Sequence, residues 1–296
     1  MNHVWKTRLV ILVLLIAGTG LTTLRSCHRH SRPLPPWESV WKLHLEAGFT
    51  APEKGTMIRL PAPKSTSGLR VYKESFYHPN LRLENVNGAE GGRELIGRAF
   101  EPGESLFSAE FDVHLSPEKN FPVRFSNGEL AALQRARYLK ETADFPVSAP
   151  GVTRKLSELS ADENPRKDLV EKIFGYCHRQ IVSGTIYDID SATLAIQSRK
   201  ASMLGCARAM VTLCRAARFP ARLVVGFEIK NAPYYPDPLY WVEVHMDNTW
   251  VSYDPTNGYA REIPAEFLPV RRDGGHEIFR IDGVKPSDLN LSYRID

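Results

Sequence analysis

The sequence predicts an α+β protein in which an antiparallel β-rich unit precedes a domain that packs helices beside a second antiparallel sheet. Strict alternation of apolar and polar residues dominates the first half of the chain, whereas helical spacing and strand-like runs share the second half. The 296 residues, 43% of them apolar, suffice for one large or two ordinary domains. We expect a basic membrane anchor at 1–32, the β-rich unit at 33–125, a helical or loop-rich connector at 126–163, and the helix-plus-sheet domain at 164–296.

An uncharged, apolar stretch at residues 9–24 predicts an N-terminal membrane helix. It is shorter than the about 20 residues of a spanning helix, but Lys6 and Arg8 can snorkel and lengthen the apolar span. A cleaved signal peptide is the alternative, although no small-x-small site follows the apolar core. Cys27 resembles the cysteine of a lipoprotein site, but Arg25 suits that site poorly. Basic residues flank the stretch on both sides, so they do not fix its orientation.

The positive charge belongs to this flank rather than to a nucleic-acid surface. Of the overall +4, residues 1–32 contribute five basic and no acidic residues, which leaves about −1 for the rest. The run CHRH at residues 27–30 could hold a metal, but a solvated basic tail is the commoner meaning of such a run. The four cysteines show neither CxxC nor zinc spacing. We therefore expect no nucleic acid, metal or cofactor.

Strand patterns fill residues 37–117, where WKLHLEAGF, LRVYKESFY and SLFSAEFDVHL alternate between turn-forming clusters. Residues 128–142 predict a charged helix, and the stretch from there to Pro165 predicts a loop. Pro165 is itself a helix-start signal, and another helix is expected from about Ser202. The apolar positions of that last helix form one stripe, consisting of Met203, Ala207, Met210, Val211 and Cys214.

After this helix the sequence predicts strands. Pro220 ends the helix, ARLVVGFEI has the composition of a buried strand, and LYWVEVHM and TWVSYDP form a hairpin around Asp247 and Asn248. Arg222 and Glu243 have the parity to pair across neighbouring strands.

The second half also offers the residue types of a cysteine enzyme. Cys206, His245 and Asp254 could serve as nucleophile, base and orienting acid. The hairpin argues against this set, because a two-residue turn places Trp241 opposite Asp254 and His245 opposite Trp250. His245 then lies four strand positions, or about 13 Å, from Trp241, so Asp254 cannot orient its ring. We expect Asp254 to accept hydrogen bonds in the D-P-T turn that it begins.

The motifs around the hairpin resemble those of the transglutaminase-like fold in the papain-like superfamily. R-A-x-x-x-P-A-R follows a helix, W-V-E-V lies in a strand, and W-V-x-x-D-P-T follows the turn, all within residues 164–262. Two positions depart from the family pattern, since Arg218 replaces a glycine and Phe219 an isoleucine. The matching residues are Arg215, Ala216, Pro220, Ala221, Arg222, Trp241, Glu243, Trp250, Asp254, Pro255 and Thr256.

The resemblance implies where a catalytic cysteine would stand. In active members the nucleophile lies twelve residues before the arginine that corresponds to Arg215, which is Met203 in this chain. The alanine that the family has in this helix then coincides with Ala207, which supports this register. Cys206 therefore lies outside the family's nucleophile position.

The resemblance also places the histidine of the triad. The family's histidine stands two residues before the tryptophan that corresponds to Trp241, and that position is Leu239. Of the implied triad, only Asp254 remains. The chain is most similar to the bacterial group of inactive transglutaminase domains associated with seven transmembrane helices, which the later stretches PAEFLPVRRDGG and HEIFRIDG also resemble.

This resemblance implies an extracytoplasmic domain, so we expect an inner-membrane protein whose folded part faces the periplasm. We expect a pseudoenzyme that binds a peptide or an envelope protein, with a seven-helix membrane module in the same or another chain. Two alternatives stay open: a cysteine peptidase or acyltransferase using Cys206, His245 and Asp254, and a purely structural ectodomain. The residues expected to line the former catalytic cleft are Met203, Leu239, Trp241, Tyr234 and Tyr235.

Overall fold

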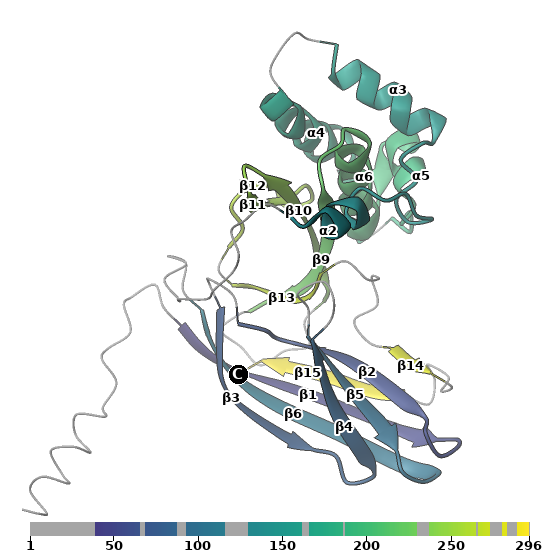
Figure 1. Cartoon of the computed structure of the whole chain (residues 1–296), viewed down its shortest axis with the longest axis vertical. Coiled ribbons are helices and arrows are strands. Elements are labelled where there is room, and N and C mark those ends of the chain that lie inside the picture. Colours follow the sequence, from purple (N-terminus) through teal and green to yellow (C-terminus); the bar gives the residue numbers. More distant parts are fainter. Residues whose placement is uncertain are drawn as a thin grey trace, which may run out of the picture. The chain divides into compact units, whose positions relative to one another are not determined.

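A computed structural model of the chain (Figure 1) describes residues 39–65, 69–87, 93–115, 130–161, 166–185, 187–229, 237–264, 266–272, 280–282 and 289–295. The expected membrane helix at 9–24, Cys27, the CHRH run, Tyr234 and Tyr235 lie outside these residues. Among the helices that the structure describes, none combines the length and the apolar character needed to cross a membrane.

The N-terminal part is a pair of antiparallel sheets around one apolar core. Strand order is β15-β1-β6-β3 in the first sheet and β14-β2-β5-β4 in the second. In β6 every second residue is buried, from Ser105 to Leu115, as expected for a strand with one face toward a core. The strands are β1 Ser39–Ala51, β2 Met57–Ala62, β3 Leu69–Tyr77, β4 Leu81–Asn87, β5 Arg93–Ala99 and β6 Gly103–Leu115.

The last two strands of the chain return to these sheets. β15 (Leu289–Ile295) pairs with β1, from Leu43 opposite Ile295 to Phe49 opposite Leu289. β14 (Arg280–Asp282) pairs with β2 in the same antiparallel way. The segment 164–296, expected to be one domain, thus contributes its final strands to the β-rich unit.

The second domain surrounds helix α6 with further helices and a five-stranded antiparallel sheet (Figure 1). The sheet order is β12-β11-β10-β9-β13, and β7 pairs with β8 in parallel. The helices are α2 Ala132–Arg137, α3 Pro150–Leu159, α4 Arg166–Gln180, α5 Ala192–Ser198 and α6 Met203–Ala216. The strands are β7 Val182–Ser183, β8 Lys200–Ala201, β9 Ala221–Glu228, β10 Leu239–Met246, β11 Thr249–Asp254, β12 Tyr259–Arg261 and β13 Phe267–Arg272. The mixed α and antiparallel β architecture confirms the predicted fold class for the described part.

The stretch expected to be a connector belongs to this domain. The predicted helix over 128–142 is limited to α2, and the predicted loop after it contains α3, which starts with Pro150 in its first turn. Tyr138, Phe145 and Val152 are buried, the latter two in the core around α6. The prediction of a loop was wrong because proline, serine and alanine near a helix start resemble loop composition.

Helix α6 is buried on all sides rather than along one stripe. Ser202 caps it by accepting a hydrogen bond from the Gly205 N–H at 3.0 Å. Every residue from Leu204 to Arg215 is buried, including Arg208 and Arg215. Arg215 donates to the carbonyl of Ala221 at 2.9 Å, which offsets the cost of burying its charge.

The end of α6 explains one departure from the family pattern. Arg218 has φ 63°, in the left-handed region where glycine carries no side-chain penalty. The Phe219 N–H donates to the Cys214 carbonyl at 2.9 Å and closes the helix. The turn therefore requires a positive φ at this position, which glycine adopts freely and Arg218 adopts at a conformational cost.

The predicted hairpin is confirmed. Asp247 and Asn248 have φ 48° and 61°, the signature of a two-residue turn between twisted strands. Val242 pairs with Tyr253 and His245 with Trp250. Side chains of β10 alternate between the two faces of the sheet, and Val242 belongs to the apolar core that contains the residues of α6.

Candidate functional site

The positions that the family pattern singles out stand at the ends of three elements. Met203 is the first residue of α6, Leu239 the first of β10 and Asp254 the last of β11. Continuing the observed register places Trp241 opposite Asp254, with Leu239 as a diagonal neighbour. Met203 and Leu239 are partly exposed, and their thioether and isobutyl groups have no proton to exchange and no thiolate to offer.

Asp254 is committed to the turn that follows it. Its carboxylate accepts the backbone N–H groups of Thr256 and Asn257 at 2.9 Å each, and the Asn257 side chain at 2.8 Å. Burial raises the pKa of Asp254, while these hydrogen bonds and nearby His178 act in the opposite direction. The expected turn role of Asp254 is confirmed. His178, which the sequence did not single out, lies with Nδ1 3.1 Å from the Pro255 carbonyl oxygen.

Cys206 is an interior residue. It is 0% exposed, and its Sγ donates weakly to the Cys177 carbonyl at 3.6 Å. Burial raises the pKa of Cys206 to about 12; contacts with Ser183 and Thr256 oppose the shift, and the charge of Asp254 adds to it. The thiol therefore remains protonated at neutral pH, and a thiol is a far weaker nucleophile than a thiolate.

His245 lies in a different environment from Cys206 and Asp254. Its ring meets the Trp250 ring edge to face, with 5.2 Å between centroids. Burial and the charges of Arg135 and Arg222 lower the pKa of His245. The structure brings Cys206 and Asp254 into electrostatic contact, but His245 stands at the turn end of the hairpin, four positions from Trp241 along β10, or about 13 Å.

Arg222 and Glu243 pair across β9 and β10 as strand parity predicts. The Arg222 guanidinium lies 2.6 Å from Glu243 Oε2, and Arg272 approaches the same carboxylate at 3.3 Å. Burial alone would raise the pKa of Glu243, but the two arginines outweigh it, so the pKa is lowered. Arg222 also stacks on Trp250, 3.9 Å from the ring centroid. This cluster holds the hairpin together.

Of the described cleft candidates, Trp241 is the most buried. It is 1% exposed and packs with Val224 and Phe267, and Leu239 lies against this cluster. Among the described residues, the buried Trp241 Nε1 has no hydrogen-bond partner. Trp241 thus supports the sheet, while Met203 and Leu239 remain accessible.

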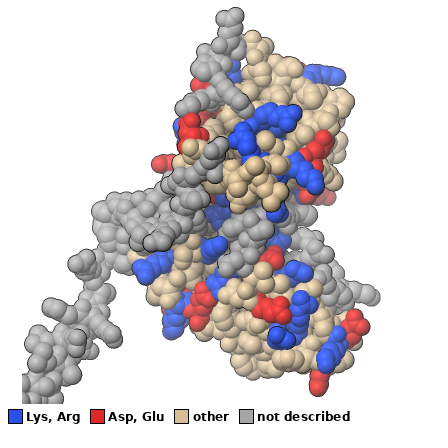
Figure 2. Space-filling view, viewed as in Figure 1, with Lys and Arg blue, Asp and Glu red and all other residues tan. Residues whose placement is uncertain are grey.

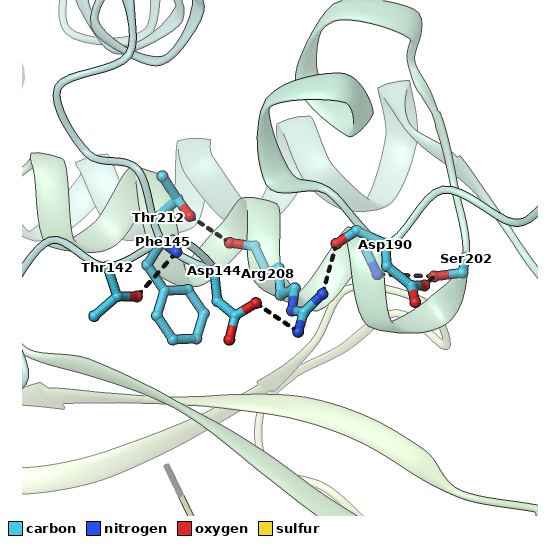
Figure 3. A network of polar contacts seen from close by, with 8 residues as sticks. Thr142, Asp144, Phe145, Asp190, Ser202, Arg208 and Thr212 are labelled. Carbon is cyan, nitrogen blue, oxygen red and sulfur yellow. Dashed lines mark hydrogen bonds and ion pairs between the residues drawn. The ribbon is translucent and has the colours of Figure 1, made fainter. Parts of the chain in front are cut away.

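A polar network lies beside the start of α6 (Figure 3). Arg208 donates to Asp190 O at 3.2 Å and pairs with Asp144 Oδ1 at 2.7 Å, and the Asp190 carboxylate accepts the Ser202 hydroxyl. Burial raises the pKa of Tyr240, the charge of Asp190 adds to this, and Arg208 opposes it. The one sequence signal for this network is a cation within the apolar run of α6.

Surface charge and ligand-type clusters add no further site. On the face shown in Figure 2, basic and acidic side chains are intermingled over the described residues, unlike the continuous basic surface that binds nucleic acid. Within the described ranges, no three His, Cys, Asp or Glu side chains gather as a metal site would need.

One region of the chain matches a known protein family. Residues 154–255 match the family model for the transglutaminase-like superfamily. This part of the chain is a transglutaminase-like domain. A comparison with curated protein sequences found no significant match.

Two solved structures resemble this chain in fold to different extents. A protein from Cytophaga hutchinsonii, proposed to be a cysteine protease, superposes with a TM-score of 0.62 at 16% identity, over 88% of this chain and 91% of that chain. The periplasmic domain of TgpA from Pseudomonas aeruginosa gives a TM-score of 0.42 at 15% identity, over 72% and 87%. At such identities the Cytophaga structure shows a shared fold and not a shared activity.

Proposed function

We propose that this chain is a membrane-anchored pseudoenzyme whose transglutaminase-like domain faces the periplasm and binds a peptide or an envelope protein without covalent chemistry. The observation that carries the proposal is the pair Met203 and Leu239 at the starts of α6 and β10. A cysteine and a histidine at these two positions would form the catalytic pair of an active relative.

The remaining titratable groups support a non-catalytic role. The Cys206 thiol is 0% exposed, and its pKa is raised to about 12. The Asp254 carboxylate accepts hydrogen bonds from residues of its own turn. His245 packs on Trp250 rather than beside Cys206. A general base needs hydrogen-bond reach to its nucleophile, which this arrangement does not supply.

Binding is the use that the preserved framework supports best. Met203 and Leu239 leave apolar, partly exposed side chains at the positions where an active relative would carry its cysteine and histidine. Apolar contact with a few polar donors is the usual make-up of a peptide site. The uncharged stretch 9–24 would hold this domain at the inner membrane, beside a seven-helix membrane module in the same or another chain.

Peptide-array binding by the purified full chain tests the recognition role. Met203→Glu should abolish binding, because a carboxylate replaces apolar contact, while a negative charge in the first turn of α6 does not harm the helix. Leu133→Glu is the matched control, since Leu133 is an apolar residue 84% exposed on α2. Failure of the chain to bind any envelope peptide would favour the structural ectodomain.

Turnover assays separate the proposal from the enzyme alternative. We expect neither peptide cleavage nor hydroxylamine incorporation into peptides. A rate that disappears in Cys206→Ser would establish the cysteine peptidase or acyltransferase instead.

Cell fractionation tests the anchor. The full chain should sediment with the inner membrane and be digested by protease added to the periplasmic side. Removal of residues 1–32, directed to the periplasm by an unrelated cleavable signal, should yield a soluble periplasmic protein. A truncated chain that still sediments with membranes would contradict the anchoring role of residues 9–24.

A further inference from the structure

Arg208 is a buried cation in the central helix of the domain. It is 7% exposed and stands between Ala207 and Ala209 on α6. Its guanidinium donates to the main-chain carbonyl of Asp190 at 3.2 Å and pairs with the Asp144 carboxylate at 2.7 Å (Figure 3). Anionic and carbonyl partners offset the cost of burying a guanidinium, so an anion that replaced the Asp144 carboxylate would be favoured at this position.

Asp144 is an exchangeable partner. Its side chain is 49% exposed, against 9% for Arg208. The main chain around it is held by other contacts, because Arg215 donates to the Lys140 carbonyl at 3.0 Å and stacks on the buried Phe145 ring at 4.3 Å. Rotation of the Asp144 side chain into solvent would therefore uncover Arg208 without moving the loop.

Tyr240 supplies a second donor at the same place. The Tyr240 side chain packs against the apolar core around α6, and the charges of Asp190 and Arg208 act on its pKa in opposite directions. None of the described residues hydrogen-bonds its hydroxyl, and the side chain is only partly buried. On β10 its side chain points to the opposite face from Leu239 and packs toward α6, whose first residue is Met203 of the proposed peptide site.

We propose that Arg208 and Tyr240 form a carboxylate-recognition subsite, and that Asp144 is an internal stand-in which the carboxylate of a bound peptide displaces. The exchange conserves charge, since one carboxylate leaves the guanidinium as another arrives. The Asp190 carboxylate is engaged by the Ser202 hydroxyl at the cap of α6 and remains in place. The subsite deepens the proposed peptide-binding function and rests on it only for the identity of the ligand.

Chemical rescue with acetate tests the subsite without any peptide. In the full chain, Asp144→Ala should lower the melting temperature, and acetate should restore it more than chloride at equal ionic strength. Asp188→Ala, the matched control, removes an exposed aspartate from the loop that carries Asp190 and should show no acetate-specific gain. The double variant Asp144→Ala with Arg208→Met should lose the rescue. Equal effects of acetate and chloride on Asp144→Ala would overturn the subsite.

Peptide binding tests the ligand class. An N-acetylated peptide with a free C-terminus should bind about tenfold more tightly than its C-terminal amide, because the amide forfeits a charge-assisted contact. An amide with an internal aspartate that recovers the affinity would identify an acidic side chain as the source of the carboxylate. Equal affinities for the acid and amide peptides, together with no acetate rescue of Asp144→Ala, would refute the subsite. They would not contradict the proposed peptide-binding function. Acetate rescue without binding of any peptide would keep the subsite and refute the peptide-binding function.

Discussion

At the residue scale, the reactivity of Cys206 depends on its protonation state, because a thiolate is a far stronger nucleophile than a thiol. Cys206 stands three positions beyond Met203, and this small displacement moves the thiol from the start of α6 into its interior. Burial there raises the pKa of Cys206 to about 12. The buried Cys206 thiol is thus held in its protonated form, while Met203 at the start of the helix carries a thioether.

His245 makes a prediction at the same scale. Burial, Arg135 and Arg222 lower its pKa below the ordinary 6.5, so the folded state keeps the ring neutral. The unfolded chain binds the proton first, and stability present above about pH 6.5 is lost as the pH falls toward the folded pKa. Urea unfolding at pH 7.5 and 5.5 should show a loss of up to about 1.4 kcal/mol per pH unit that His245→Gln reduces. Identical pH dependence in the wild type and the variant would contradict the assignment.

Motif spacing could reach Met203, Leu239 and Asp254, because each lies a fixed number of residues from a recognisable tryptophan, arginine or proline. The same reasoning could not reach Arg208 and Tyr240. Their partners Asp144 and Asp190 come from loops whose approach to α6 depends on tertiary packing.

At the element scale, α6 owes its position to close contact on all sides. The periodicity of its apolar residues indicated one buried stripe, but α3, α4 and α5 cover the remaining surface. Helical periodicity reports where apolar side chains stand, and it cannot show that small or paired polar residues are buried as well. The loop around Ile189 also packs against α6 and buries part of its surface.

Gly205 shows how closely the loop around Ile189 approaches α6. A Cβ at this position would lie 1.9 Å from the Ile189 carbonyl oxygen, so Gly205→Ala must push the loop from the helix. We expect a loss of about 2 kcal/mol in the free energy of unfolding, despite the better helix propensity of alanine. Gly184→Ala, where a Cβ would meet nothing within 4 Å, should be neutral or slightly stabilising in the same chemical denaturation experiment. Equal behaviour of the two variants would rule out the close approach.

At the scale of the whole molecule, the two ends of the folded chain share one pair of sheets. Local alternation predicted the strands of residues 37–117, but nothing local indicates that β15 pairs with β1 or β14 with β2. Such pairings depend on residues far apart in sequence, which is why domain boundaries drawn along the chain missed them. The sequence could predict that the sheets are antiparallel. It could not predict which strands belong to each sheet.

Removal of residues 283–296 should therefore destabilise the N-terminal sheets rather than the transglutaminase-like domain. The deletion exposes the main-chain donors and acceptors of β1 along its pairing with β15. Hydrogen exchange should show faster exchange in β1 and β6 and little change in α6. Faster exchange confined to α6 would contradict the pairing.

The most direct test restores the residues that an active relative would carry. Met203→Cys combined with Leu239→His should place a thiol and an imidazole near Asp254, and the ion pair should lower the thiol pKa. The account predicts that iodoacetamide modifies this thiol at pH 6 at least about tenfold faster than in Met203→Cys alone. Equal rates in the two variants, or rapid modification of Cys206 in the unaltered chain, would contradict it.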